Sequence, residues 1–235
     1  MGARQRFTVN ARVMRTTKTR RRRRLSDGGN VDTGENVAVE ALVRMRESNH
    51  RIKNNLQVLM SLLALQSRQS EEGQERWALL DACARVAAVA RLHERLEDAA
   101  FEDRIDVALF VNEICADLRT CFASDRLVLE ADIEAAHLSA KAALPVGLMV
   151  SELVTNAVKH GGAGGACHVR VSLRKEAVGW HLRVVDDGPG IEADALESRS
   201  RSGSRLLFAL ARQLGGSIEI DEVASGASLS VRFPA

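Results

Sequence analysis

The segment at residues 48–57 combines residue types that can carry and bind a phosphoryl group. His50 offers a ring nitrogen that can attack phosphorus, and the two basic side chains and two asparagines that follow it can donate hydrogen bonds to phosphoryl oxygens. Glu47, one helical turn earlier on the same side, is a candidate to orient or deprotonate the ring, and Asn54, one turn later, is a further candidate catalytic residue. An ordinary surface histidine stays the alternative for this segment alone.

Glu152, Asn156, Lys159 and His160 stand at spacings that share one face of a helix. A carboxylate and an amide oxygen suit a hard cation such as Mg²⁺, and a lysine can neutralise phosphates. The cluster therefore predicts a site for a metal-bound phosphate group. A solvated helix face would show the same spacing and stays the alternative.

Two glycine-bearing segments could bring their backbone close to a ligand. Asp186 follows an apolar run and precedes Gly188 and Gly190, whose lack of a side chain permits a close approach. Gly203 and Arg205 lie where small residues open a helix, and the free amides of a helix N-terminus bind phosphates. Each segment alone could also be an ordinary turn or helix start.

A heptad pattern predicts a long helix that carries His50. It runs through Leu42, Met45, Asn49, Ile52, Leu56, Leu59, Leu63 and Gln66. At about 100° per residue, His50 lies about 130° from the centre of this seam, so we expect it to face solvent. A second series follows a short polar break, at Leu79, Ala82, Val86, Val89, His93 and Leu96. The two helices form a hairpin whose apolar face two copies would bury as a four-helix bundle, which predicts a homodimer.

The rest of the chain mixes helical and strand patterns. The pattern predicts helices at 105–122, 145–160 and 206–214 and strands at 127–133, 168–173, 180–185, 218–220 and 227–233. Pro145 suits the first turn of the second of these helices. The order predicts an α/β sandwich with helices on one face of the sheet, and the whole chain is therefore assigned to the α+β class. We divide it into a disordered tail (1–36), a helical hairpin (37–100) and an α/β domain (101–235).

Composition limits the partners and the compartment. The tail contains an unbroken arginine run from Arg20 to Arg24, which cannot be buried and predicts disorder. No aromatic residues interleave with this run and no folded nucleic-acid module accompanies it, so nucleic acid is not the expected partner. No apolar run approaches the roughly 20 residues of a membrane helix, and no secretory signal is present. Four scattered cysteines without a CxxC pair predict reduced thiols, and together these features predict a soluble cytoplasmic protein.

Taken in order, the four polar segments resemble those of the sensor histidine kinases. The segments are residues 50–57, 152–160 and 186–191 and the glycine-led helix that ends at Gly215 and Gly216. The likeness is greatest to the HisKA_2 subfamily, whose dimerisation helix carries a similar His-Arg-Val-Lys-Asn-Asn run. It covers about residues 40–235, which is all of the chain except the tail.

The resemblance implies an ATP-dependent protein histidine kinase of a two-component system, with a dimerisation hairpin and a Bergerat-fold ATP-binding domain. His50 would accept the γ-phosphoryl group of Mg-ATP and pass it to an aspartate on a response-regulator receiver domain. Asn156 would coordinate Mg²⁺, and Glu152 would assist the metal or its water. Lys159 and His160 would face the phosphates.

The glycine segments take their roles from the same resemblance. Asp186 would accept a hydrogen bond from the adenine amino group, while Gly188 and Gly190 shape the pocket around the base. Gly203 would lie against the phosphates, with Arg205 beside it.

The second glycine box departs from the family pattern, because it reads Arg201-Ser-Gly203 where Gly-x-Gly is usual. This departure supports an alternative in which the chain is a phosphotransfer protein whose nucleotide site no longer binds ATP. A second alternative is a regulatory module whose ATPase-like domain sequesters a partner. The sequence contains no recognisable sensor domain, so a separate sensory protein is one expected source of input.

Overall fold

The computed structural model describes residues 32–71, 73–98, 104–122, 127–161, 167–191, 202–223 and 225–235. Most of the Arg-rich tail and Arg201 lie outside these residues. The chain divides into two compact units, residues 1–41 and 42–235, and the packing described below belongs to the second. Among the described helices, none combines the length and apolarity that crossing a membrane requires.

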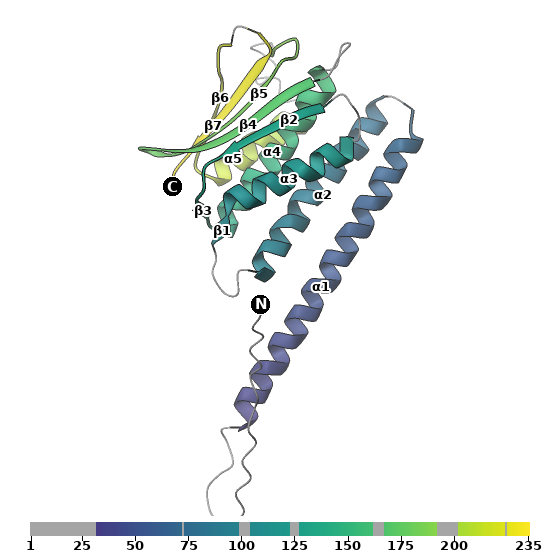
Figure 1. Ribbon diagram of the computed structural model, residues 1–235, viewed down its shortest axis with the longest axis vertical. Coiled ribbons are helices and arrows are strands. Elements are labelled where there is room, and N and C mark those ends of the chain that lie inside the picture. The colour runs from purple at the N-terminus through teal and green to yellow at the C-terminus, as the bar shows by residue number, and fades with distance from the viewer. Residues whose placement is uncertain are drawn as a thin grey trace, which may run out of the picture. The chain divides into compact units, whose positions relative to one another are not determined.

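The predicted hairpin is present as two helices, α1 (Asp32–Gln69) and α2 (Gln74–Asp98) (Figure 1). Helix α1 begins five residues earlier than the predicted start at residue 37. Asp and Thr, the residues at positions 32 and 33, are favoured at helix N-termini, which agrees with the earlier start. The two helices touch through the ion pair of Lys53 with Glu94, at 2.9 Å, and through the Cys83 thiol near the Met60 carbonyl oxygen, at 3.7 Å.

Helix α2 buries a face next to the predicted seam. The seam residues from Leu79 to His93 are only half-buried and Leu96 is exposed. The buried apolar positions are instead Leu80, Cys83, Ala84, Ala87, Ala88, Ala90 and Leu92. This face packs against α3 and α4 of the same chain. Helix α2 therefore has two packing faces, since one face lies against the α/β segment and the other faces α1.

The α/β segment contains a five-stranded sheet in the order β2-β4-β5-β7-β6. The strands are β2 (Leu127–Ile133), β4 (Cys167–Glu176), β5 (Gly179–Asp186), β6 (Ser217–Ile220) and β7 (Ala227–Phe233). Strands β2 and β4 are parallel, and the other neighbours are antiparallel. Two further strands, β1 (Ile105–Asp106) and β3 (His137–Leu138), form a small antiparallel pair that the sequence analysis did not predict.

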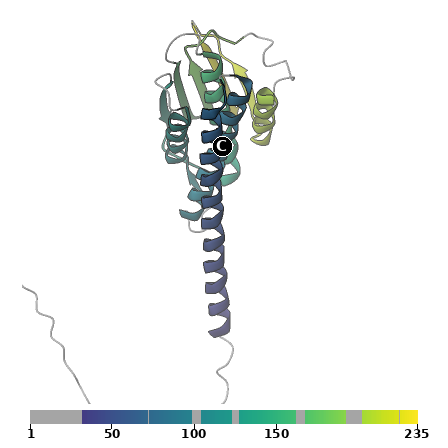
Figure 2. The same cartoon turned by 90° about the vertical axis from the view of Figure 1, so that its right-hand side faces the viewer.

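Three helices cover one face of the five-stranded sheet: α3 (Val107–Phe122), α4 (Ala140–Gly161) and α5 (Ser202–Gln213) (Figures 1 and 2). Helix α3 packs on β2, α4 on β4 and β5, and α5 on β6. This arrangement confirms the predicted fold class, a helical hairpin followed by a mixed-sheet sandwich.

Helix α4 begins at Ala140, so the prediction that Pro145 would lie in its first turn was wrong. The carbonyl oxygen of Ser139 accepts hydrogen bonds from the amides of Ala142 and Ala143, which starts the helix one turn earlier. The proline lacks an N–H and cannot complete the bond to the carbonyl four residues before it. The helix therefore accommodates Pro145 near its start rather than beginning there.

Close packing of α3 on α4 depends on Gly147. A Cβ atom at this position would lie 2.8 Å from the side chains of both Phe110 and Ile114, which are fully buried. Contacts this short force neighbouring side chains or backbone to shift.

We therefore expect Gly147→Ala to lower the free energy of unfolding by about 1–3 kcal/mol, because overpacking outweighs the gain in helix propensity. Urea denaturation followed by circular dichroism measures the change. Gly73→Ala is the matched control, because no atom lies within 4 Å of the added Cβ. Equal effects of the two substitutions would contradict the packing argument.

Candidate functional site

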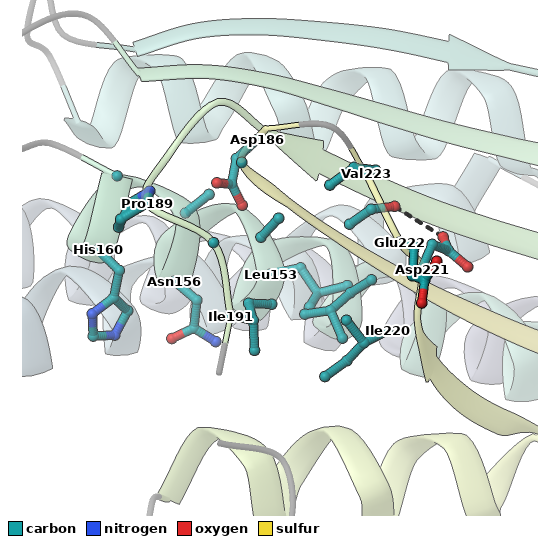
Figure 3. A pocket seen from close by; sticks show the side chains of 17 residues that line it. Leu153, Asn156, His160, Asp186, Pro189, Ile191, Ile220, Asp221, Glu222 and Val223 are labelled. Atoms are coloured by element: carbon teal, nitrogen blue, oxygen red, sulfur yellow. Dashed lines mark hydrogen bonds between the residues drawn. The ribbon is translucent and has the colours of Figure 1, made fainter. Parts of the chain in front are cut away.

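A cavity of about 680 Å³ opens between α4 and the ends of strands β5, β6 and β7 (Figure 3). Its apolar wall is formed by Leu153, Ala157, Ile191, Ile220, Val223 and Leu229. Polar side chains of Asn156, His160, Asp186, Asp221 and Glu222 converge on the same space. An apolar cavity with a few convergent polar groups is typical of a small-molecule site.

Asp186 lies at the end of β5, where the strand carries its half-buried carboxylate into the cavity. Its Oδ1 atom accepts a hydrogen bond from the backbone amide of Gly188 at 2.9 Å. Burial raises the pKa of Asp186 above its ordinary value, against opposing hydrogen bonds from the Gly188 and Ala227 amides. The carboxylate is thus held in place and presents an acceptor to a ligand in an apolar surrounding.

Glycines around Asp186 allow three backbone segments to meet. Gly226 has φ +78° and lies so close to the Asp186 carbonyl that a Cβ would be 1.8 Å from its oxygen. Gly190 also has a positive φ, of +94°. A Cβ at Gly188 would lie 2.8 Å from Asp186 Oδ1 and 2.9 Å from the Cα atom of Gly161 at the end of α4. Side chains at Gly188 and Gly226 would push these segments apart and so displace Asp186.

Asn156 and His160 project from α4 toward the cavity, one helical turn apart (Figure 3). Within the described ranges, the half-buried Asn156 side chain makes no hydrogen bond, so its amide is available to a ligand. Lys159 is exposed and does not line the cavity, because the neighbouring position on a helix points about 100° away. The structure therefore brings Asn156 and His160 to Asp186, and places Lys159 outside this group.

Glu152 lies one turn before Asn156 and is almost completely buried, with 3% exposed. Its Oε2 atom accepts hydrogen bonds from Arg85 of α2, at 2.7 Å from Nη2 and 3.2 Å from Nε. Its Oε1 atom faces the first turn of α5, where a Cβ at Gly203 would lie only 2.2 Å away. That same point is 3.7 Å from Asn156 Nδ2, so Glu152, Asn156 and Gly203 form one junction. Arg205 is exposed on α5 and does not line the cavity.

His50 lies exposed on α1, as the heptad pattern predicts. The Asn54 Nδ2 atom lies 3.4 Å from His50 Nδ1 and can donate to it while that ring nitrogen is unprotonated; with Nδ1 protonated, the amide oxygen would have to face the ring instead. Glu47 instead pairs with Arg51, with 2.6 Å between Oε1 and Nη2. In this arrangement the neighbour of the His50 ring is therefore Asn54 rather than Glu47.

Asp221 is a site residue that the sequence analysis did not single out. It lines the cavity (Figure 3). It accepts hydrogen bonds from Ser228 Oγ at 2.9 Å, Ser230 Oγ at 3.0 Å and Arg183 Nε at 3.0 Å. Burial raises its pKa, but the hydroxyl donors and the arginine charge outweigh that effect and leave the pKa lowered. An acidic pair directly after the predicted strand at 218–220 was the available signal.

Two family models match the chain. Residues 47–122 match the family described as histidine kinase, and residues 142–235 match the family described as histidine kinase-, DNA gyrase B-, and HSP90-like ATPase. The first match contains His50, and the second contains Glu152 and the residues that line the cavity. The chain belongs to the histidine kinases. The first match runs through α3, and the predicted division at residue 100 stays a prediction.

Known histidine kinases align with most of this chain. The sensor histidine kinase PdtaS of Mycolicibacterium smegmatis is 30% identical over 195 residues, which cover 77% of this chain and 37% of that protein. Blue-light-activated histidine kinase 2 of Erythrobacter litoralis is 26% identical over 219 residues, covering 88% of this chain and 62% of that protein. The chain thus spans about two fifths to three fifths of the length of these relatives.

A solved structure has the same fold. The histidine kinase domain of the Erythrobacter litoralis EL346 blue-light activated histidine kinase superposes with a TM-score of 0.61. The match covers 80% of this chain and 94% of that one at 19% identity, so it supports the fold of the kinase region and nothing finer.

The Asp221 cluster makes a testable contribution to stability. We expect Asp221→Asn to lower the free energy of unfolding at pH 7 by about 1–3 kcal/mol, because three donors lose a charged acceptor. Folding lowers the pKa of the Asp221 carboxyl from its ordinary value of 3.8, so the ionised group stabilises the folded protein at pH values above 3.8. This stabilisation is lost as the pH falls through the folded pKa. The difference between variant and wild type should therefore shrink below about pH 4.

Chemical denaturation of both proteins at neutral and acidic pH measures this difference. Glu222→Gln is the control, because this exposed neighbour lines the same edge of the cavity outside the hydrogen-bonded cluster. A stability loss that stays the same at every pH would show that the charge of Asp221 is not its cause.

Proposed function

We propose that this chain is the kinase region of a two-component system, which transfers the γ-phosphoryl group of ATP to His50 and then to an aspartate of a response-regulator receiver domain. One observation supports this function above the others. An apolar cavity holding Asp186 and Asn156 lies in the same histidine kinase chain as an exposed histidine on the helix that precedes it.

The adenine ring fits the part of the cavity near Asp186. Leu153, Ile191 and Leu229 offer an apolar wall for a flat base, and the held carboxylate can accept from an exocyclic amino group. Guanine carries a carbonyl where adenine carries this amino group, and two acceptors would face each other. We therefore expect ATP to be preferred over GTP.

The phosphates would extend toward Asn156, His160 and the first turn of α5, where helix amides favour an anion. The residues present fit Mg²⁺, because the Asn156 amide has no partner within the described ranges and the Glu152 carboxylate lies in the same junction. Bound Mg²⁺ would neutralise charge on the phosphates. Lys159 and Arg205 are exposed and do not line the cavity, so a contact with the outer phosphates would require their long side chains to reach toward it.

In the transfer step, an imidazole nitrogen lone pair of His50 forms a bond to the γ-phosphorus while the bond to the β–γ bridging oxygen breaks and ADP leaves. The ring proton passes to solvent or a neighbouring base. Asn54 is placed to orient the ring through Nδ1, which its Nδ2 atom faces. If the amide turns over so that its oxygen accepts the Nδ1 proton, Nε2 keeps the lone pair that can attack. Glu47 would need to leave Arg51 before it could act as a base.

Transfer requires a different arrangement from the one described. Lys53 of α1 contacts Glu94 of α2. Arg85, which precedes Glu94 by nine residues on α2, contacts Glu152 of α4. At 1.5 Å per residue, His50 therefore lies about 15–18 Å along the helices from Glu152, whereas reacting atoms must approach to about 3–3.5 Å. Either the hairpin moves against the α/β segment or a second copy supplies the histidine.

Incubation with γ-labelled ATP and Mg²⁺ tests the function. We expect label on the wild type and none on His50→Ala or Asn156→Ala, since the first lacks the acceptor and the second the metal ligand. Thermal denaturation of each variant checks that it is folded, and chase with a receiver domain should move the label to that protein.

Two other outcomes would decide for the alternatives. An unlabelled wild type that accepts phosphoryl groups on His50 from a phosphorylated receiver would support a phosphotransfer protein without ATP binding. An unlabelled wild type that accepts none would favour the module that sequesters a partner.

Dimerisation is part of the proposed function, and α1 offers the surface for it. Ile52, Val58, Leu59, Leu62 and Leu65 are exposed by 37–58%, although all are large and apolar. His50 lies about 120–180° round the helix from Ile52, Leu59 and Leu62, so a second copy could cover these three residues and leave the histidine accessible.

We expect Leu62→Glu to shift the protein from dimer to monomer, because the glutamate would be buried unpaired between the two copies. Light scattering coupled to size-exclusion chromatography measures the mass. Ser61→Glu adds the same charge at an exposed position about 100° away and should leave the dimer intact. A wild type that is monomeric at every concentration would rule out this surface as a dimer interface.

A further inference from the structure

Helix α2 contacts Glu152, at the edge of the proposed nucleotide site, through Arg85. Arg85 projects from α2 and binds Glu152 of α4 through two nitrogen atoms, at 2.7 and 3.2 Å. Its Nη2 atom also donates to Asp81 Oδ2 at 2.6 Å, one turn back on α2. The three charged residues join the phosphotransfer hairpin to the helix that lines the cavity.

The Glu152 carboxylate stands between Arg85 and the site proposed for the phosphates. One of its oxygens faces Arg85, and the other lies against Gly203 in the first turn of α5. The side chain is 3% exposed, and burial, followed by the charge of Asp81, raises its pKa despite the opposing effect of Arg85. Arg85 therefore supplies the cation beside a carboxylate that the surrounding protein does not favour as an ion.

The charges of this cluster do not cancel. Asp81 and Glu152 carry two negative charges and Arg85 one positive charge, and the Oδ1 atom of Asp81 is buried without a hydrogen-bond partner in the described part of the chain. ATP brings a highly negative triphosphate to the junction of Asn156 and Gly203. Repulsion between this triphosphate and Glu152 is strong in a partly buried site and weak only while Arg85 is paired with the carboxylate.

We propose that Arg85 is a positioning residue of the nucleotide site, which acts through Glu152 by holding its carboxylate and screening its charge from the triphosphate. This inference rests on the proposed binding of ATP in the cavity. It makes nucleotide affinity depend on a residue of the hairpin, and hence on whether α2 is docked on α4. Movement of α2 away from α4 would remove the screening cation, so release of the hairpin and the hold on nucleotide are coupled.

A purely structural role for Arg85 gives different expectations. Arg91, also on α2, binds Asp117 of α3 through two nitrogen atoms at 2.6 and 2.7 Å, and neither residue lines the cavity. The two arginines are similarly exposed, with 34% for Arg85 and 31% for Arg91. Arg91→Ala is therefore a matched control that breaks a docking contact without touching the nucleotide site.

Calorimetric titration with ATP, in EDTA and again in excess Mg²⁺, tests the proposal. In EDTA we expect Arg85→Ala to bind ATP about tenfold more weakly than wild type, because an unscreened carboxylate faces the phosphates. In Mg²⁺ the loss should be smaller, since the metal supplies positive charge at the same junction. Arg91→Ala should match wild type under both conditions.

Two further variants separate charge from folding. Asp81→Asn keeps an acceptor for Arg85 and removes one negative charge, so it should tighten ATP binding in EDTA by about two- to fivefold. Glu152→Gln, added to Arg85→Ala, should restore most of the lost affinity in EDTA, because no carboxylate is then left unpaired. If Arg85→Ala does not fold, the proposal is tested by whether Asp81→Asn tightens or weakens ATP binding in EDTA.

Equal losses in Arg85→Ala and Arg91→Ala would overturn the proposal and assign Arg85 to docking alone. Unchanged affinity in Arg85→Ala, or no tightening in Asp81→Asn, would overturn it as well. A wild type that binds no ATP in either buffer would instead refute the proposed function, and the inference with it. Wild-type binding that Asn156→Ala weakens in Mg²⁺ establishes that the cavity is the site before the arginine variants are compared.

Discussion

Helix α4 must be buried on two sides and still present polar groups to a cavity. Its residues Val146, Val150 and Val154 are fully buried, with the sheet on one side and α2 and α3 on the other. Only a narrow strip of α4 is left to face the cavity, formed by Leu153, Asn156, Ala157, His160 and Gly161. Any shift of α4 would therefore move the candidate nucleotide site and the core together. The close fit at Gly147 opposes such a shift.

Helix α2 packs on α4 and also contacts α1, so it links the buried helix of the candidate site to the helix that carries His50. One face of α2 continues the core of the α/β segment, and the ion pairs of Arg91 and Arg95 with α3 fix its register. The other face meets α1, which carries His50. A helix that belongs to both parts can transmit movement between them, and Glu152 is the point at which such movement would reach the nucleotide.

Much of the molecule was predictable because its signals are local. The heptads of α1, the strand alternation at 127–133 and 227–233, and the helix that carries Glu152 and Asn156 each depend on neighbours within a few residues. The helix start at Ala140 was missed because Pro145 gave a strong local signal for a first turn, which the Ser139 carbonyl overrides. The short pair β1 and β3 has too few residues to form a pattern.

The family, the order of the main elements and the exposed position of His50 could be predicted, since each follows from residue type and spacing along single elements. Which groups meet depends on tertiary structure. Arg85 and Glu152 are 67 residues apart, and Asp221 joins Arg183 across the sheet. No periodicity reports such pairs, because they depend on how α2 docks on α4 and on the register between strands. For the same reason only the folded chain shows Lys159 outside the cavity that His160 lines.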